Sequence, residues 1–289
     1  MSEVLTCTGP DGRSVAWAEF GDAGGVPVLF LHGTPGSRLN PAALDDLYAR
    51  MGIRIIAPDR AGFGRTDPIP DRRVVDAAAD LVTLLDALEL PSCFVVGGSG
   101  GGPHALGLAA AAPARVRAVG VLVGAAPLRP EEIEGQVALN QEMMALVGQP
   151  DALRAKIAVA ADVLLNQGMS ALAPDASESD KAMWASRAEP MRRMVAAAVE
   201  RGVGGWAEDY EAIWGRPWGF ELSEVAAPVV WAHGDADHNV PLPAATRLAS
   251  GIPDCRFITW HDVGHAPGNE LYAEFFAALF ARALNVDAA

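Results

Sequence analysis

The 289-residue sequence predicts an α/β protein whose mostly parallel sheet is flanked by helices and interrupted by an inserted helical block. Short apolar runs alternate with amphipathic stretches over the first part of the chain, and the same rhythm returns near the end. Between them lie helical stretches with no convincing strand. Because repeated strand–loop–helix units build parallel sheets through right-handed crossovers, we expect residues 1–126 and 227–289 to form one core. Residues 127–226 are expected to form a helical cap over the carboxyl edge of its sheet.

Five strands are expected before the cap. The first segment alternates polar and apolar side chains, whereas the later runs are continuously apolar, as is typical of strands buried on both faces. These strands are residues 14–20, 26–31, 53–57, 92–96 and 116–123. Helices are expected at residues 41–51, 72–90 and 101–112, and the second repeats its apolar side chains at helical spacing.

The expected cap is rich in alanine, methionine and glutamate, and it carries four of the chain's 7 tryptophans. These four are candidates for lining a substrate pocket, although large side chains also pack a cap against a core. They are Trp184, Trp206, Trp214 and Trp218. The polar tract at residues 173–181 is expected to be a mobile loop. After the cap, strands are expected at residues 228–232 and 255–260, and helices at residues 243–250 and 269–285.

The composition argues against several classes of partner. A formal net charge of −14 disfavours nucleic acid, because binding phosphates requires clustered lysine and arginine. Cys7, Cys93 and Cys255 lie far apart, in no spacing typical of zinc ligands or disulfides, so we expect free thiols, a cytoplasmic location and no bound metal. The N-terminal residues show no secretory pattern, and no apolar run approaches the ~18 residues that cross a bilayer. We therefore expect no membrane partner.

The most informative segment is the Gly-Gly-Ser-Gly-Gly run at residues 97–101, which follows an expected strand directly. Small residues on both sides of a serine allow the sharp strand-to-helix turn that exposes its hydroxyl at the carboxyl edge of a sheet. The N-terminus of the following helix stabilises negative charge there. A phosphate-binding loop is the alternative, but residues 102–104 lack the Gly-Lys-Ser/Thr ending of such a loop. Ser99 is therefore the candidate nucleophile.

A serine needs a base, and an acid that orients the base, to act as a nucleophile at neutral pH. Among the 6 histidines, His265 lies in the loop between the last expected strand and the last expected helix, at the same sheet edge as Ser99. His261 stands nearer the strand end and is more typical of a structural residue. Asp235 and Asp237 compete for the acid in the loop after the first strand that follows the cap. Asp237 lies further into that loop and is favoured, and Asp235 is expected to cap the turn through its own backbone.

An oxyanion formed at the serine needs two preorganised N–H donors. Gly100, directly after the candidate nucleophile, supplies one from its backbone. Thr34, in the His-Gly-Thr-Pro-Gly loop after strand 26–31, is placed to supply the second. Only the backbone of Thr34 is required for this role. His32 in the same loop is expected to be a buried, hydrogen-bonded anchor.

Four motifs in this order resemble the α/β-hydrolase superfamily. They are H-G-T-P-G at residues 32–36, G-G-S-G-G at 97–101, G-D-A-D at 234–237 and V-G-H-A-P at 263–267. The resemblance covers essentially the whole chain, and it implies an eight-stranded α/β-hydrolase fold with its cap after the sixth strand. It also implies a catalytic triad of Ser99, Asp237 and His265.

A serine nucleophile in this superfamily implies acyl transfer, because the dehalogenases and epoxide hydrolases of the superfamily use aspartate at that position. The resemblance therefore implies a cofactor-independent hydrolase for the carboxylic ester, lactone or thioester of a small, mostly apolar substrate. An aminopeptidase of the proline-iminopeptidase type is the alternative, because H-G-T-P-G resembles the oxyanion motif of that group and the cap is acidic. A non-catalytic ligand binder is a third hypothesis. The sequence is also compatible with a homodimer.

Overall fold

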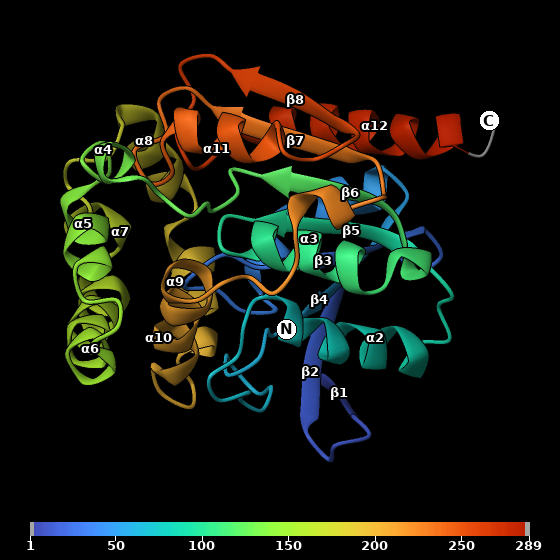
Figure 1. Cartoon of the computed structure of the whole chain (residues 1–289), viewed down its shortest axis with the longest axis horizontal. Coiled ribbons are helices and arrows are strands. Elements are labelled where there is room, and N and C mark those ends of the chain that lie inside the picture. Colours follow the sequence, from blue (N-terminus) through green and yellow to red (C-terminus); the bar gives the residue numbers. More distant parts are fainter. Residues whose placement is uncertain (1–2, 287–289) are drawn as a thin grey trace.

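The computed structural model describes residues 3–286 and contains an eight-stranded sheet (Figure 1). The strands are β1 (Leu5–Thr8), β2 (Ser14–Gly21), β3 (Val26–Leu31), β4 (Ile53–Pro58), β5 (Cys93–Gly98), β6 (Val116–Leu122), β7 (Val229–Gly234) and β8 (Cys255–Trp260). They lie in the order β1-β2-β4-β3-β5-β6-β7-β8. Strands β3 to β8 run parallel to one another, whereas β2 is antiparallel to both β1 and β4. This topology confirms the predicted mostly parallel sheet.

Strand β1 has no counterpart among the predicted strands. It is a four-residue strand at the edge of the sheet, and its side chains alternate between half-buried and exposed. It therefore lacks the continuous apolar run that marks the buried strands. Leu5 and Cys7 nevertheless pack against the core from this strand.

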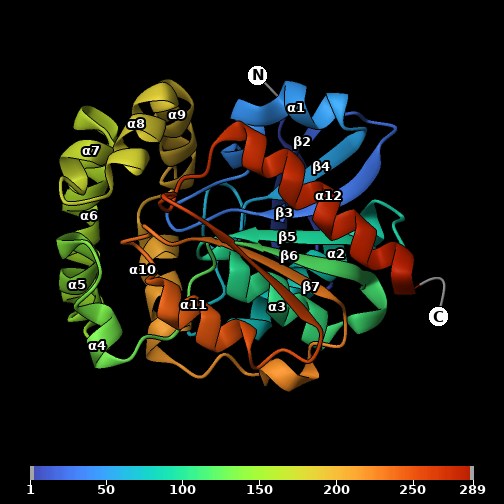
Figure 2. The same ribbon diagram turned by 90° about the horizontal axis from the view of Figure 1, so that it is seen from above.

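Helices cover both faces of the sheet (Figure 2). On one face, α1 (Asp45–Arg50) and α12 (Asn269–Val286) bury aromatic side chains such as Tyr48 and Phe275 against the strands. On the other face lie α2 (Ala78–Ala87), α3 (Gly101–Ala111) and α11 (Leu242–Ala249). Because both faces are covered, the central strands are continuously apolar. Short 3-10 helices connect these elements at η1 (Asn40–Leu44), η2 (Val75–Ala77) and η3 (Pro113–Arg115).

After β6 the chain forms a series of helices that lie beyond the carboxyl ends of the parallel strands (Figure 1). They have an apolar cluster of their own, in which Leu153, Ile157 and Trp206 are buried. This segment occupies the place expected for the cap, and we use that name for it below. Its helices are α4 (Pro130–Ile133), α5 (Ala138–Met144), α6 (Pro150–Gln167), α7 (Met169–Leu172), α8 (Glu178–Ser186), α9 (Ala188–Ala198), α10 (Gly204–Tyr210) and the π-helix η4 (Glu211–Gly215). The 3-10 helix η5 (Leu222–Glu224) follows them and packs beside α3 of the core.

The polar tract at residues 173–181 is packed chain rather than the expected mobile loop. Ala173 and Ala176 are buried in a small apolar cluster of the cap. Ser177 then caps α8, since its hydroxyl oxygen accepts the backbone N–H of Asp180 at 3.2 Å. The Ser-x-x-Asp spacing is a known signature of a helix start, so this signal was available in the sequence. The packed tract directs Asp180 toward the core.

Two expectations drawn from composition can be compared with the structure. Cys7, Cys93 and Cys255 are all free, and burial raises the pKa of the Cys93 thiol to about 12. Within residues 3–286, no helix has both the length and the apolar character needed to cross a bilayer.

Candidate active site

Ser99 lies at the sharp turn between β5 and α3. Its φ angle is 50°, in the left-handed region, and its N–H donates to the carbonyl oxygen of Leu122 on the neighbouring strand β6 at 2.8 Å. A Cβ on Gly97 would lie 2.2 Å from the carbonyl oxygen of Gly101, and a Cβ on Gly101 would lie 2.1 Å from that of Leu31. The turn therefore excludes side chains on both sides of the serine. It holds the hydroxyl at the carboxyl edge of the sheet.

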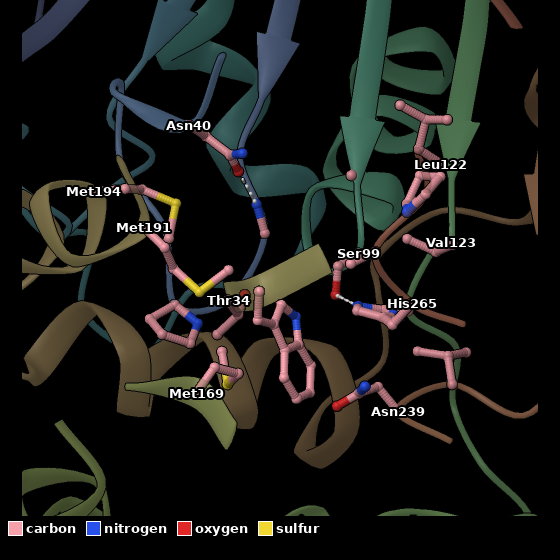
Figure 3. Close-up of a pocket in the computed structure, with 18 of the residues that line it drawn as sticks. Thr34, Asn40, Ser99, Leu122, Val123, Met169, Met191, Met194, Asn239 and His265 are labelled. Carbon is pink, nitrogen blue, oxygen red and sulfur yellow. Dashed lines mark hydrogen bonds between the residues drawn. The ribbon is translucent and has the colours of Figure 1, made fainter. Parts of the chain in front are cut away.

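Ser99, His265 and Asp237 form a continuous hydrogen-bonded chain. His265 Nε2 lies 2.9 Å from Ser99 Oγ (Figure 3). On the other side of the ring, His265 Nδ1 lies 2.7 Å from Asp237 Oδ2. The three side chains follow β5, β8 and β7, whose carboxyl ends share one edge of the sheet. The structure thus brings together the three residues that the sequence proposes as a triad.

The carboxylate of Asp237 is buried and fixed by the backbone. Its Oδ1 accepts the N–H groups of Asn239 at 2.8 Å and Val240 at 2.9 Å. Its Oδ2 faces the ring of His265, and Nε2 of the buried His233 lies 3.3 Å from the same oxygen. Burial by itself raises the pKa of a carboxyl group, but the neighbouring His265 and His233 outweigh it and hold the pKa of Asp237 well below its usual range. Asp237 is therefore ionised at neutral pH and accepts Nδ1–H of His265.

The environment of His265 suits a proton acceptor. Burial lowers the pKa of its imidazole, but the carboxylates of Asp237 and Asp180 raise that pKa by more than burial lowers it. The pKa of His265 therefore lies above the usual value. Because Nδ1–H is donated to Asp237, Nε2 is the nitrogen free to accept the hydroxyl proton of Ser99.

A second Asp–His pair lies on the same two loops. His261 Nδ1 is 2.9 Å from Asp235 Oδ2, and Asp235 Oδ1 accepts the N–H of Asp262 at 2.8 Å. The side chain of His261 is 84% exposed, compared with 18% for His265. Asp235 therefore links the two loops at the surface through both carboxylate oxygens, and its carboxylate also contacts its own backbone N–H, as expected from the sequence.

Helix α8 of the cap binds the loop that carries His265. The buried carboxylate of Asp180 accepts the N–H of Ala266 at 2.7 Å, and Ser179 Oγ accepts the N–H of Gly264 at 3.0 Å. The backbone is thus held on both sides of His265. The sequence indicates where α8 begins but gives no sign of this contact, because its partners lie about 85 residues apart.

Two backbone N–H groups are free beside the nucleophile. Those of Thr34 and Gly100 donate to no acceptor in the part of the chain that the structure describes. A Cβ on Gly100 would lie 3.4 Å from the nitrogen of Thr34, and a Cβ on Gly33 would lie 3.2 Å from the Cβ of Ser99. Two neighbouring free amides at a nucleophile are the arrangement that binds an oxyanion.

A cavity of about 240 Å³ opens beside Ser99, between the sheet edge and the cap. Figure 3 shows the sulfur-bearing side chains of Met169, Met191 and Met194 across the cavity from Ser99 and His265. Apart from His265, Arg187 is the charged residue among the described lining residues, and none of them is an aspartate or a glutamate. The cavity therefore offers a largely apolar wall and no anionic group.

The four tryptophans proposed for the pocket separate into two pairs. Trp184 and Trp214 line the cavity. Trp206 is instead buried inside the cap, and Trp218 packs on the apolar core with its Nε1 donating to the carbonyl oxygen of Ile213 at 2.9 Å. The prediction that Trp206 and Trp218 line the pocket is therefore wrong. These two side chains pack away from the cavity, which is the alternative role given above for large side chains of a cap.

Known proteins resemble this chain in sequence and in fold. A non-heme chloroperoxidase from Streptomyces lividans is 39% identical over 124 residues, which are 42% of this chain and 45% of that protein. A proline iminopeptidase from Neisseria gonorrhoeae is 35% identical over 123 residues, 42% of this chain and 39% of that protein. The match thus spans less than half the length of either relative.

Similarity in fold extends over nearly the whole chain. The solved structure of a thermophilic esterase from Thermogutta terrifontis matches with a TM-score of 0.68 at 23% identity, and the match covers 97% of each chain. A family model described as the alpha/beta hydrolase fold matches residues 26–268, which include the candidate nucleophile, base and acid. The chain therefore belongs to the alpha/beta hydrolase fold family.

Proposed function

We propose that this protein is a serine hydrolase that cleaves the carboxylic ester, lactone or thioester of a small, mostly apolar substrate. The observation that carries the proposal is the hydrogen-bonded chain from Ser99 Oγ to His265 Nε2 at 2.9 Å and from His265 Nδ1 to Asp237 Oδ2 at 2.7 Å. Nucleophile, base and orienting acid are arranged for acyl transfer.

In the first half of the proposed reaction, Ser99 becomes acylated. Its Oγ attacks the carbonyl carbon while His265 Nε2 takes the hydroxyl proton, and the carbonyl oxygen becomes an oxyanion. The free N–H groups of Thr34 and Gly100 bind that oxyanion. The tetrahedral intermediate collapses with cleavage of the ester C–O bond, and His265 gives its proton to the departing alcohol oxygen.

In the second half, water releases the acyl group. His265 Nε2 takes a proton from a water molecule, and the resulting hydroxide attacks the carbonyl carbon of the acyl-enzyme. Collapse of the second tetrahedral intermediate breaks the bond to Ser99 Oγ, which recovers its proton from His265. A carboxylic acid leaves, and the free enzyme is restored.

The cavity favours a neutral ester over a peptide with a free amino group. An aminopeptidase must bind a positively charged amine, but the described lining residues include no carboxylate and do include the cation Arg187. At about 240 Å³ the cavity is also smaller than the ~300–1,000 Å³ of typical drug-sized ligand sites, which favours short acyl chains. The second candidate remains a proline-iminopeptidase-type activity, because the relative from Neisseria gonorrhoeae has that name.

The free cysteines bear on where the protein works. Unpaired thiols at Cys7, Cys93 and Cys255 support a cytoplasmic location, which is part of this proposal.

Hydrolysis of p-nitrophenyl acetate, butyrate and octanoate, beside that of proline p-nitroanilide, tests the proposal. We expect turnover of the two shorter esters, little turnover of the octanoate and none of the anilide. Ser99→Ala should abolish ester turnover, because it removes the nucleophile and leaves the turn intact. Anilide cleavage that depends on Ser99 would establish the aminopeptidase instead. Absence of Ser99-dependent turnover on all four substrates would point to a narrow substrate range or to the non-catalytic ligand binder.

A further inference from the structure

Asp209, on cap helix α10, is a buried carboxylate held by two buried arginines of the core. Arg60 donates from Nη1 to Oδ1 at 2.7 Å and from Nη2 to Oδ2 at 2.6 Å, and Arg72 donates from Nη2 to Oδ1. Burial raises the pKa of a carboxyl group, but Arg60 and Arg72 outweigh it and hold the pKa of Asp209 well below its usual range. We call these three side chains, Asp209, Arg60 and Arg72, the buried group. It has a net positive charge, because two guanidinium cations face one carboxylate.

The group fixes the peptide that carries the N–H of Thr34. Arg60 Nη2 donates to the carbonyl oxygen of Gly33 at 3.1 Å, and Nδ1 of the buried His32 donates to the same oxygen at 2.8 Å. That carbonyl and the N–H of Thr34 belong to one planar peptide unit and point in opposite directions. Holding the carbonyl oxygen therefore sets the direction of the N–H.

The side chain of Thr34 is bound by the same group. Its hydroxyl donates to Oδ2 of Asp209 and accepts from Nη2 of Arg60, the latter at 2.9 Å. An oxyanion needs only the backbone N–H of Thr34, so the sequence predicts no required contact for this hydroxyl. The structure gives it two charged partners.

A neutral histidine extends the group to the second amide donor. His104 Nδ1 donates to the carbonyl oxygen of Gly100 at 2.8 Å, and Arg72 Nη1 donates to His104 Nε2 at 2.8 Å. Burial and the nearby cations Arg60 and Arg72 lower the pKa of His104 to about 3, so at neutral pH it can donate on one side and accept on the other. Both residues that present free N–H groups to Ser99 are thus anchored to one buried group.

We propose that Asp209, Arg60 and Arg72 are positioning residues for the oxyanion-binding amides of Thr34 and Gly100. The cap would then supply the central carboxylate that aligns catalytic amides of the core. The inference rests on the proposed serine-hydrolase function. It depends on contacts between residues far apart in sequence, since Asp209 and Arg60 are separated by 149 positions.

Substitutions at Thr34 test this inference with little change in shape. Thr34→Val replaces the hydroxyl with a methyl group of similar size, and Thr34→Ser restores the hydroxyl. Thr66→Val is the matched control, because Thr66 is also buried and its hydroxyl accepts the N–H of Ala16 at 2.9 Å, outside the cavity lining.

The readouts separate positioning from structure. For p-nitrophenyl butyrate we expect Thr34→Val to lower kcat by about 10–100-fold with KM little changed. A displaced N–H donor stabilises the oxyanion of the transition state less, whereas binding of the substrate does not depend on it. Affinity for a trifluoromethyl ketone, whose adduct with Ser99 bears an oxyanion, should fall in parallel. Affinity for the product acid butyrate should stay the same. Thr34→Ser should recover most of both losses, and Thr66→Val should show neither.

Asp209→Asn tests the carboxylate itself. It leaves Arg60 and Arg72 facing a neutral amide, so we expect its melting temperature to fall. A folded Asp209→Asn protein should lose at least as much kcat as Thr34→Val. If this variant does not fold, the kinetics of the Thr34 variants alone test whether the buried group positions the amides.

The outcomes are distinguishable. An active wild type with Thr34→Val at wild-type kcat, or Thr34→Val matched by Thr66→Val, would overturn this inference and leave the proposed function standing. A wild type that neither hydrolyses esters nor binds the trifluoromethyl ketone would overturn the proposed function and this inference with it.

Discussion

Two Asp–His pairs occupy the loops after β7 and β8, and their geometry is nearly the same. The nitrogen–oxygen distance is 2.7 Å for His265 and Asp237 and 2.9 Å for His261 and Asp235. By distance alone, either pair could orient a base. The surroundings differ: the side chain of His261 is 84% exposed, whereas that of His265 is 18% exposed and its second nitrogen lies 2.9 Å from Ser99 Oγ.

The difference shows that an Asp–His pair gains a chemical role from its third partner and from burial. Asp237 is ionised in a site shielded from water, where its interaction with His265 is strong. Asp235 and His261 face solvent, where an ion pair of this kind contributes little. The cap adds to the contrast, because Asp180 and Ser179 bind the backbone on both sides of His265.

Replacing the two histidines gives the largest expected contrast. His265→Gln removes the base, so we expect kcat/KM for p-nitrophenyl butyrate to fall by about 10⁴-fold or more. His261→Gln is the matched control and should stay within about twofold of wild type, because it loses only an exposed contact. Equal losses in the two variants would show that the exposed pair also serves the reaction.

Replacing the two aspartates should give the next largest contrast. Asp237→Asn keeps the shape of the side chain but removes the charge that orients and stabilises the His265 ring, and we expect kcat to fall by about 10³–10⁴-fold. Asp235→Asn should have little effect. Steady-state kinetics on one ester would check both variants, and the reverse result would move the acid to Asp235.

The pH dependence of turnover should reveal the smaller effect of the cap on His265. The base must be unprotonated, so turnover is low below the pKa of His265 and rises as pH increases through it. Because Asp237 and Asp180 raise that pKa, the acid limb of the wild-type plot of turnover against pH should lie above pH 6.5, the usual pKa of histidine. Asp180→Asn removes one of the two raising charges, and its limb should lie at lower pH than that of wild type.

The control for the pH experiment is Glu178→Gln on the same helix. The side chain of Glu178 is 91% exposed, so its removal should leave the limb in place. An Asp180→Asn limb that coincides with wild type, or lies at higher pH, would contradict the role of Asp180 in setting the pKa of His265.

Local patterns in the sequence predicted most of the sheet and the elements around Ser99. Continuous apolar runs marked the strands buried on both faces, and the small residues on both sides of Ser99 marked its turn. Ser99, Asp237 and His265 could be proposed because each follows a strand, and the carboxyl ends of parallel strands meet at one edge. Strand β1 gave no comparable signal because it is short and lies at the edge of the sheet.

The contacts between cap and core could not be predicted in the same way. Asp180 and Asp209 are aspartates in an acidic segment, and no local pattern shows that they contact the core while other carboxylates of the cap, such as Glu178, face solvent. Their partners lie far away in the sequence and become neighbours only when the cap helices pack on the sheet. The same packing decides which tryptophans reach the cavity, since Trp184 and Trp214 do and Trp206 and Trp218 do not.

Labelling with a fluorophosphonate, followed by peptide mapping by mass spectrometry, would show directly whether Ser99 is the activated nucleophile. Such a probe forms a covalent bond with an activated serine and needs no matched substrate. We expect one rapidly modified residue, Ser99, in wild type and in Asp235→Asn, and much slower modification in Asp237→Asn. Modification at another residue, or an unlabelled Ser99 in a protein that hydrolyses esters, would contradict this expectation.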